Sequence, residues 1–290
     1  MIIKKTVLIL LCALVLVSVG CGISTTGQMP PAADERPIIA VTIAPQRTFV
    51  EAVCGDLARV VTVVPPGSSP ETYEPAPREI EDIRSASLYF SIGVPAEEAY
   101  IFSDIGDVKI VALHVEAALA FPDRTFEEGE RDHHIWLSPK RVKVMIEAIA
   151  REMSKLDEAN SGTYEKNAKE YIAQLEELDR QITAALEGVR NRKFIVYHPA
   201  FGYLADDYGL EMFALEEEGK EATPRHLQNM LDLAKQQNIK VIFYQEEIDS
   251  RQSQAYAEEI GGRSVQLEPL APDYIENLKK MAETLAEAMR

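Results

Sequence analysis

Four residues with metal-binding side chains stand in loops or at strand ends of this chain: Glu71, His134, His198 and Glu268. Imidazole nitrogens and carboxylate oxygens are ligands that suit Zn²⁺ and Mn²⁺. Two neutral histidines and two carboxylates would also neutralise the charge of a divalent ion. Taken one at a time, each residue has a simpler explanation, as a capping or core histidine or as a solvated loop acid. The residue types alone therefore give a metal site only as a hypothesis.

The positions of these residues along the chain favour that hypothesis. His198 and Glu268 each end a short apolar run that predicts a buried strand, and Glu71 follows a strand and a Pro-Pro-Gly turn. His134 lies just before a predicted helix. Ligands of open parallel sheets bind beyond the carboxyl ends of the strands, and the site of a two-lobed protein lies in its cleft. A metal held by two residues from each half would clamp the lobes together.

The elements that must position these residues alternate along the chain. From Ile38 onward, continuous apolar runs are separated by amphipathic stretches, which predicts parallel sheets covered by helices on both faces. Strands are expected at 38–43, 59–64, 88–92, 108–113, 193–197, 210–215, 240–244 and 264–267. Helices are expected at 46–56, 78–86, 139–156, 161–188, 223–238, 252–260 and 273–290.

The helix at 161–188 is unusually long and regular. It would extend roughly 40 Å at 1.5 Å per residue, and its apolar residues recur every three or four positions. A coiled coil is one interpretation, but a spine that packs along both halves fits the α/β pattern better. The predicted fold is α/β, with two lobes, each a parallel sheet flanked by helices, linked by one long spine helix. The expected segments are a signal peptide 1–20, a tether 21–37, a lobe 38–158, a linking helix 159–190 and a lobe 191–290.

The first residues predict export. Lys4 and Lys5 precede an apolar run at 7–17, and small residues follow before Cys21. This is the order of a signal peptide, and the run is short for a membrane span. Cys21 stands where a bacterial lipoprotein carries its lipid, although Ser18 replaces the usual Leu. We expect an exported protein, anchored by lipid to the outer face of the cell membrane. A secreted protein with a chance cysteine is the alternative.

Composition excludes several classes of function. The net charge of -17 argues against nucleic acid or an anionic membrane surface as the ligand. Cys54 is the one cysteine left after the signal and Cys21, so an internal disulfide is not expected. The remaining length, about 250 residues, is enough for one large or two modest domains. We expect a monomer.

Four segments resemble the motifs of zinc/manganese-type solute-binding proteins of ABC importers. In chain order they are 64–75 (VPPGSSPETYEP), 133–139 (HHIWLSP), 198–210 (HPAFGYLADDYGL) and 267–270 (LEPL). Each is weak alone, but together they are specific and span nearly the whole mature chain. The resemblance implies two α/β lobes on a rigid helix, a divalent metal between the lobes, and delivery of that metal to an importer permease. It also places His134 and His198 at ligand positions.

Two departures from the family pattern bear on the metal. Glu71 stands where the family normally has His, and Glu268 stands where Asp is usual. A carboxylate is a harder donor than an imidazole, so the first change leaves the choice of metal open, with zinc favoured over manganese. His133 occupies a position where proline is common. It is an alternative ligand or a bystander, and Glu247 is a second alternative.

We interpret the chain as a binding protein and not an enzyme, because four protein ligands make a closed coordination shell. A metal-dependent hydrolase is an alternative, and it would carry a metal-bound water in place of Glu71 or Glu268. A binding protein for a chelated or organic solute is another, since it would share the two-lobed design. That protein would need a pocket lined by aromatic residues and arginines.

Overall fold

The computed structural model describes residues 34–126, 129–216, 222–247 and 250–290. The predicted signal peptide and Cys21 lie outside the described residues, as do Glu127 and Glu128 of the loop before the second motif. Arg36–Arg290 form one compact unit. Within the described part of the chain, no helix combines the length and apolarity that a bilayer crossing requires.

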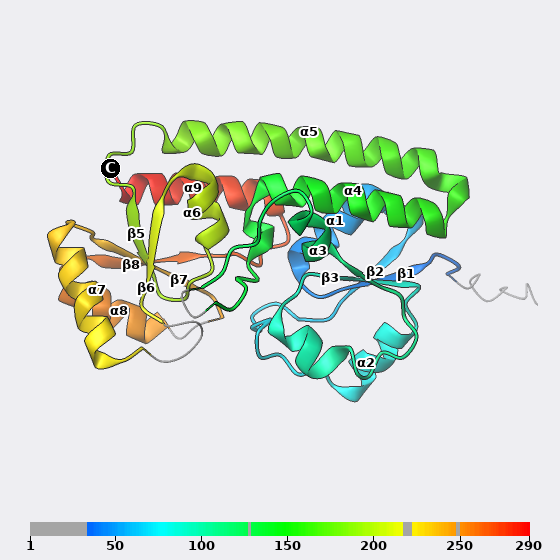
Figure 1. The fold of residues 1–290 in the computed structure, drawn as a ribbon, viewed down its shortest axis with the longest axis horizontal. Helices are drawn as coiled ribbons and strands as arrows, with labels where there is room; N and C mark the ends of the chain where they lie inside the picture. The colour runs from blue at the N-terminus through cyan, green and yellow to red at the C-terminus, as the bar shows by residue number, and fades with distance from the viewer. Residues whose placement is uncertain (1–33, 127–128, 217–221, 248–249) are drawn as a thin grey trace, which may run out of the picture. The chain divides into compact units, whose positions relative to one another are not determined.

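The N-terminal half contains a parallel sheet of four strands in the order β2-β1-β3-β4. The central strands are apolar and buried, as expected for a sheet that is covered on both faces. Its strands are β1 (Ile38–Val41), β2 (Arg59–Thr62), β3 (Leu88–Ser91) and β4 (Ile110–Ala112). Its helices are α1 (Ala44–Cys54), α2 (Pro77–Arg84), α3 (Leu113–Ala118) and α4 (Pro139–Leu156). Helix α2 lies on the face of this sheet opposite to α4 (Figure 1).

The C-terminal half repeats the same topology, with four parallel strands in the order β6-β5-β7-β8. In both sheets the first strand in sequence pairs with the second and the third, so the carboxyl ends of the central strands meet at one edge. The strands are β5 (Lys193–Val196), β6 (Glu211–Ala214), β7 (Val241–Gln245) and β8 (Arg263–Leu267). The helices are α6 (Gly202–Tyr208), α7 (Pro224–Gln236), α8 (Ser250–Glu259) and α9 (Tyr274–Ala288).

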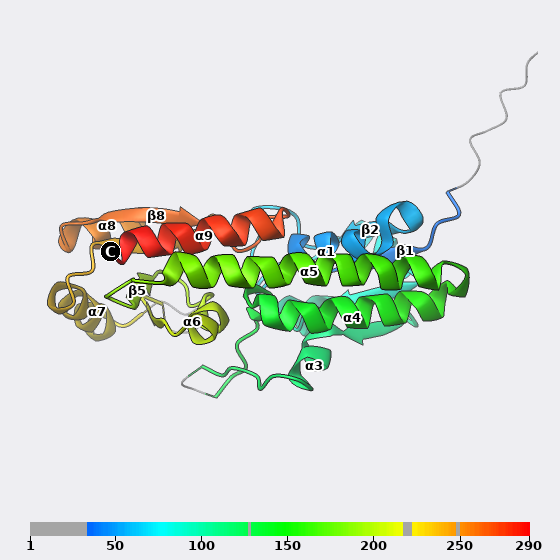
Figure 2. The same ribbon diagram turned by 90° about the horizontal axis from the view of Figure 1, so that it is seen from above.

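Helix α5 (Ser161–Leu186) runs over both lobes. It packs against α1 and α4 of the N-terminal lobe and against α9 of the C-terminal lobe (Figures 1 and 2). The apolar positions with the three- and four-residue spacing are all buried: Tyr164, Ala168, Tyr171, Leu175, Leu178, Ile182 and Leu186. One apolar cluster includes residues of both sheets and of α5, which confirms the two-lobed α/β fold with a spine helix and excludes the coiled coil.

Polar side chains also tie the lobes together at the start of α4. Ser138 caps this helix by accepting the backbone N–H of Arg141, as its sequence predicts. The Ser138 hydroxyl also donates to Asp207 of α6 over 2.5 Å, and Arg141 forms an ion pair with Asp207 over 3.0 Å. Lys140 donates to the carbonyl of Asp207. These partly buried contacts fix the second motif against the C-terminal lobe.

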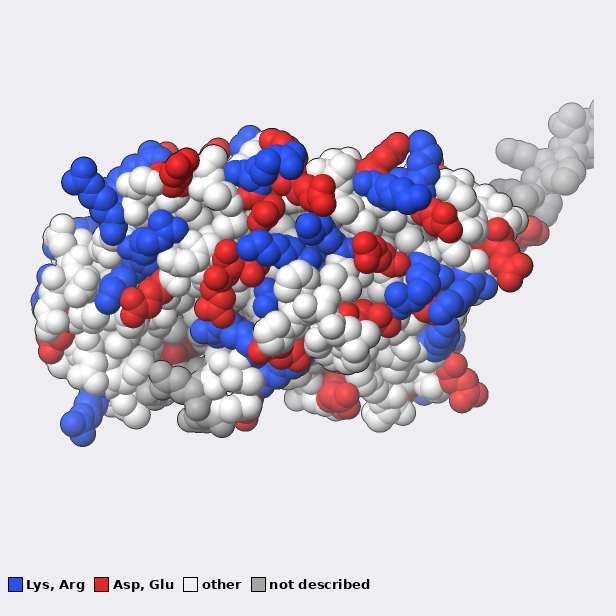
Figure 3. Space-filling view, turned by 45° about the horizontal axis from the view of Figure 1, so that its top comes forward, with Lys and Arg blue, Asp and Glu red and all other residues white. Residues whose placement is uncertain are grey.

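Helices α3 and α6 were not predicted, because elements of six and seven residues are too short to show a helical period. The predicted domain bounds stay a prediction, since the lobes share one core. The surface in Figure 3 carries acidic and basic side chains interspersed, with no large area of one sign. Despite the net negative charge, this face is a mixed one, such as soluble proteins commonly present.

Candidate metal centre

Three of the four predicted ligands come together where the lobes meet. One ligand atom from each of Glu71, His134 and His198 lies within 4.8 Å of the other two. Glu71 Oε1 is 2.9 Å from His198 Nε2 and 3.7 Å from His134 Nε2. The two Nε2 atoms are 3.3 Å apart. Both histidines are buried and Glu71 is half-buried, so the group is shielded from bulk water.

The N-terminal lobe holds His134 through Asp132. One Asp132 oxygen accepts both the backbone N–H of His134, over 3.0 Å, and its ring Nδ1, over 2.9 Å. Asp132 is fully buried and is paired with Arg124 over 3.0 Å. This arrangement leaves Nε2 as the coordinating atom, as carboxylate partners of metal-binding histidines do. Burial lowers the pKa of His134 to about 4, and the neighbouring His133 acts in the same direction, so the His134 ring is neutral at pH 7.

The C-terminal lobe holds His198 through Glu216. His198 follows β5, and Glu216 follows β6, which pairs with β5, so parallel pairing brings the two residues together. His198 Nδ1 is 2.8 Å from Glu216 Oε2, which again leaves Nε2 facing the other ligands. Burial by itself lowers the pKa of His198. The hydrogen bonds to Glu216 and Glu71 outweigh it and raise this pKa to about 9.

Glu71 sits in the turn that follows β2. Gly67 has a φ of +80°, a backbone conformation that residues other than Gly rarely adopt. Ser69 Oγ accepts a hydrogen bond from the backbone N–H of Glu71. Burial opposes ionisation of Glu71, but hydrogen bonds from His133 and His198 bring its pKa far below the usual range. Glu71 is therefore an ionised carboxylate aimed at the imidazoles.

Glu268, the fourth predicted ligand, is not part of this group. Its side chain is exposed, and its backbone carbonyl accepts the side-chain amide of Asn277 over 2.7 Å. The next two residues, Pro269 and Leu270, line a cavity of about 180 Å³ beside the histidines. Glu247 lines the same cavity, and its buried Oε2 has no hydrogen-bond partner among the described residues.

Trp136 joins the two sides of this cavity. Its indole N–H donates to the carbonyl of Pro269 over 2.9 Å, and its own carbonyl accepts the hydroxyl of Tyr274 over 2.8 Å. The ring packs 5.4 Å from the ring of His134. Trp136 therefore packs against His134 and links the second motif to the segment after β8.

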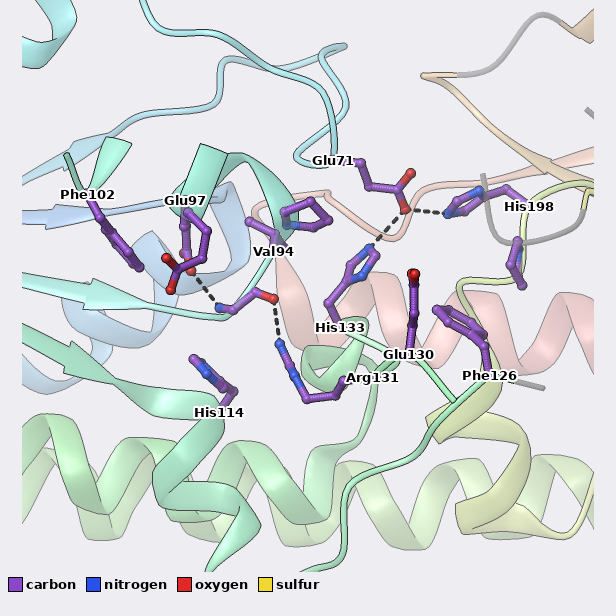
Figure 4. Close-up of a pocket in the computed structure, with 14 residues that line it drawn as sticks. Glu71, Val94, Glu97, Phe102, His114, Phe126, Glu130, Arg131, His133 and His198 are labelled. Atoms are coloured by element: carbon purple, nitrogen blue, oxygen red, sulfur yellow. Dashed lines mark hydrogen bonds and ion pairs between the residues drawn. The ribbon is translucent and has the colours of Figure 1, made fainter. Parts of the chain in front are cut away.

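A second cavity of about 410 Å³ opens on the other side of Glu71 (Figure 4). Gly93 faces it, and Arg131 donates to the Gly93 carbonyl. Gly93 has a φ of +84°, which residues other than Gly rarely adopt, and a Cβ here would also crowd Arg131 and His114. His133 and Glu71 both line this cavity.

Asp132 and Glu216 were not singled out from the sequence. The signal for Asp132 was its position two residues before His134. The signal for Glu216 was the pairing of its strand with β5, which sequence alone did not give. Each orients an imidazole and does not itself reach the three-ligand group.

Comparison with known proteins identifies the family. The model of the family "Zinc-uptake complex component A periplasmic" (ZnuA) matches residues 39–288. The chain belongs to this family. The predicted kinship with metal-binding solute-binding proteins of ABC importers is confirmed.

Individual relatives and a solved structure belong with the same family of zinc-uptake proteins. The high-affinity zinc uptake system protein ZnuA of Bacillus subtilis is 29% identical over 287 residues, covering 92% of this chain and 89% of that protein. The zinc-binding lipoprotein AdcA of Streptococcus pneumoniae is 29% identical over 254 residues, and the match spans only 51% of its length. A crystal structure of ZnuA superposes with a TM-score of 0.83 at 35% identity, covering 88% of this chain and 100% of the other.

Proposed function

We propose that this protein captures Zn²⁺ outside the cytoplasm and delivers it to the permease of an ABC importer. The observation that carries the proposal is the convergence of Glu71 Oε1, His134 Nε2 and His198 Nε2 in a buried group between the lobes. Two imidazoles and one carboxylate suit zinc, which also ranks above manganese in intrinsic affinity. The zinc-uptake relatives from Bacillus and Streptococcus support the same cargo.

Titration of metal-free protein with Zn²⁺ and Mn²⁺ tests this function. We expect one Zn²⁺ per chain, bound more tightly than Mn²⁺. His134→Ala and His198→Ala should each weaken zinc binding by roughly 100-fold or more, since loss of even an outer partner of a ligand costs 10- to 100-fold. His226→Ala is the matched control, because His226 bonds to the carbonyl of Ala214, away from the group. Unchanged affinity in both ligand variants would refute the proposal.

We further propose that the protein binds and releases metal without catalysing a reaction. In both ligand histidines the second ring nitrogen is held by a carboxylate, which fixes the rings as ligands. A metal-dependent hydrolase would keep an exchangeable water on its metal. Water-proton relaxation of the Mn²⁺-loaded protein separates the two, and fast exchange of a bound water would favour the enzyme.

We also propose that the mature protein is a monomer anchored through lipid on Cys21. The predicted signal peptide supports this, as does the lipoprotein relative from Streptococcus pneumoniae. Stable attachment requires two or more acyl chains. Cys21→Ser should move the protein from the membrane fraction to the soluble fraction of its host. Unchanged membrane association would contradict the anchor.

A further inference from the structure

A third imidazole reaches the same carboxylate oxygen. His133 Nε2 lies 2.9 Å from Glu71 Oε1, the atom that His198 Nε2 and His134 Nε2 also approach. The His133 side chain is buried, at 7% exposure. Figure 4 shows His133 and His198 both pointing at the Glu71 carboxylate. Three ring nitrogens gather around one carboxylate oxygen, which has only two lone pairs to accept hydrogen bonds.

The distances around Glu71 Oε1 are similar to those between the ligands of a bound metal. Ligands about 2.0 to 2.1 Å from a tetrahedral Zn²⁺ are about 3.3 Å from one another. From Glu71 Oε1, the distances to the Nε2 atoms of His133, His198 and His134 are 2.9, 2.9 and 3.7 Å. The distance between the Nε2 atoms of His134 and His198 is 3.3 Å. Each of these four distances is within about half an ångström of that spacing. His133 approaches the site through Glu71, because the ligand atoms that all lie within 4.8 Å of one another belong to Glu71, His134 and His198.

His133 is also supported in the orientation that a ligand needs. Its ring packs against the ring of His134 at a centroid distance of 4.2 Å, with a tilt of 36°. The ring of Phe126 approaches it at 6.5 Å from the other side. Neighbouring rings thus restrict how His133 can turn, and its Nε2 remains directed at Glu71.

We infer that His133 is the fourth ligand and that the protein binds Zn²⁺ through three imidazoles and one carboxylate. This inference rests on the proposed zinc function and names the residue that closes its coordination shell. Glu268 is exposed. Glu247 lines the opposite cavity, and its Oε2 has no hydrogen-bond partner among the described residues, whereas His133 contacts Glu71 directly.

X-ray absorption at the zinc edge tests the inference on the unaltered protein, because imidazole rings give a countable scattering signature. We expect three imidazoles and one oxygen in the first shell of the wild-type protein. Two imidazoles would overturn the inference, and would mean that His133 only holds Glu71 in place. The same measurement on His133→Gln should show the count fall from three to two.

Affinity gives an independent test. His133→Gln should weaken zinc binding about 10- to 100-fold in competition with a chelator. His114→Gln is the matched control, because His114 lines the same cavity and its Nδ1 has no hydrogen-bond partner among the described residues. We expect less than a twofold change in zinc affinity for this variant. Wild-type affinity in His133→Gln, together with weakening in Glu247→Gln or Glu268→Gln, would overturn the inference.

The outcome is separable from that of the proposed function. If His134→Ala and His198→Ala leave zinc affinity unchanged, the metal site itself is wrong. If those two variants lose zinc and His133→Gln does not, the function stands and only the fourth ligand is wrong. Circular dichroism of His133→Gln checks that the variant is folded. The number of imidazoles counted in the wild-type protein by X-ray absorption does not depend on the folding of this variant.

Discussion

His134 and His198 present the same ring nitrogen from opposite lobes, yet their surroundings push the two pKa values in opposite directions. Burial, with His133 acting in the same direction, lowers the pKa of His134 to about 4. His198 is equally buried, but its bonds to Glu216 and Glu71 raise its pKa to about 9. The N-terminal half is therefore ready for metal at pH 7, whereas the C-terminal half must first lose a proton.

The difference shows how one carboxylate serves both states of the site. In the metal-free protein, Glu71 accepts a hydrogen bond from the protonated Nε2 of His198. When metal enters, the same oxygen becomes a ligand and the proton leaves, because metal-binding histidines coordinate in the neutral form. The metal-free site thus keeps its charges paired while it waits for the ion.

The largest expected effect comes from removing Glu71, the group that both halves share. Glu71→Ala should weaken zinc binding by roughly 100-fold or more, beyond the 10- to 100-fold typical of outer partners. Glu71→His should instead raise the preference for zinc over manganese, since imidazole is the softer donor. Calorimetric titration of both variants with both metals measures this. Wild-type affinity in Glu71→Ala would remove Glu71 from the ligand set.

A smaller effect should separate the two carboxylates that hold the rings. Asp132→Asn and Glu216→Gln should each weaken zinc binding about 10- to 100-fold. Only Glu216→Gln should also lower the pKa of His198, which NMR of the ring protons reports. Asp132→Asn should lower the melting temperature more, because Asp132 is fully buried against Arg124. Equal pKa changes in both variants would contradict the comparison.

The pH dependence of binding should follow His198. Its pKa is raised in the fold, so zinc affinity should rise about tenfold per pH unit from 6.5 to about 9 and then level off. Titration in two buffers of different ionisation enthalpy should show about one proton released at pH 7. A flat affinity across this range would show that His198 is already neutral.

The stability of the metal-free protein should depend on pH through the same proton on His198. A raised pKa means that the native state binds a proton more tightly than the unfolded chain. This contribution is complete below about pH 6.5, the unperturbed value for His, and is lost as the pH rises through about 9. The melting temperature should therefore fall over that window without zinc and much less with it. His198→Gln should remove the difference.

The smallest effect should be the change in shape when metal binds. Helix α5 contains no Gly or Pro after Gly162 and packs along both lobes, so it offers few residues that can act as a hinge. Small-angle scattering with and without zinc should differ little. A clear compaction on adding zinc would show that the lobes move apart when the site is empty.

Much of the fold could be predicted because the apolar pattern is strong. The buried strands and the seven core positions of α5 follow directly from periodicity. Helices α3 and α6 could not be predicted, since each is shorter than two full periods.

The site could be predicted only in part. The motifs gave Glu71, His134 and His198, but their orienting carboxylates Asp132 and Glu216 depend on how separate segments meet. Glu268 stays a prediction as a ligand: Leu267 is buried at the end of β8, and Glu268, the next residue, is exposed in the structure. Two departures from the family pattern, Glu71 and His133, lie 2.9 Å apart, which the sequence did not reveal.

The bonds from Ser138, Lys140 and Arg141 to Asp207 have a consequence for the speed of exchange. With α5, they tie the frame of the site together across the two lobes. The turn that carries Glu71 is held by short-range backbone bonds and by one longer-range bond, from the N–H of Ala96 to the carbonyl of Pro70. We therefore expect release of the metal to begin at this turn, and the lifetime of the bound metal to follow how often the turn opens.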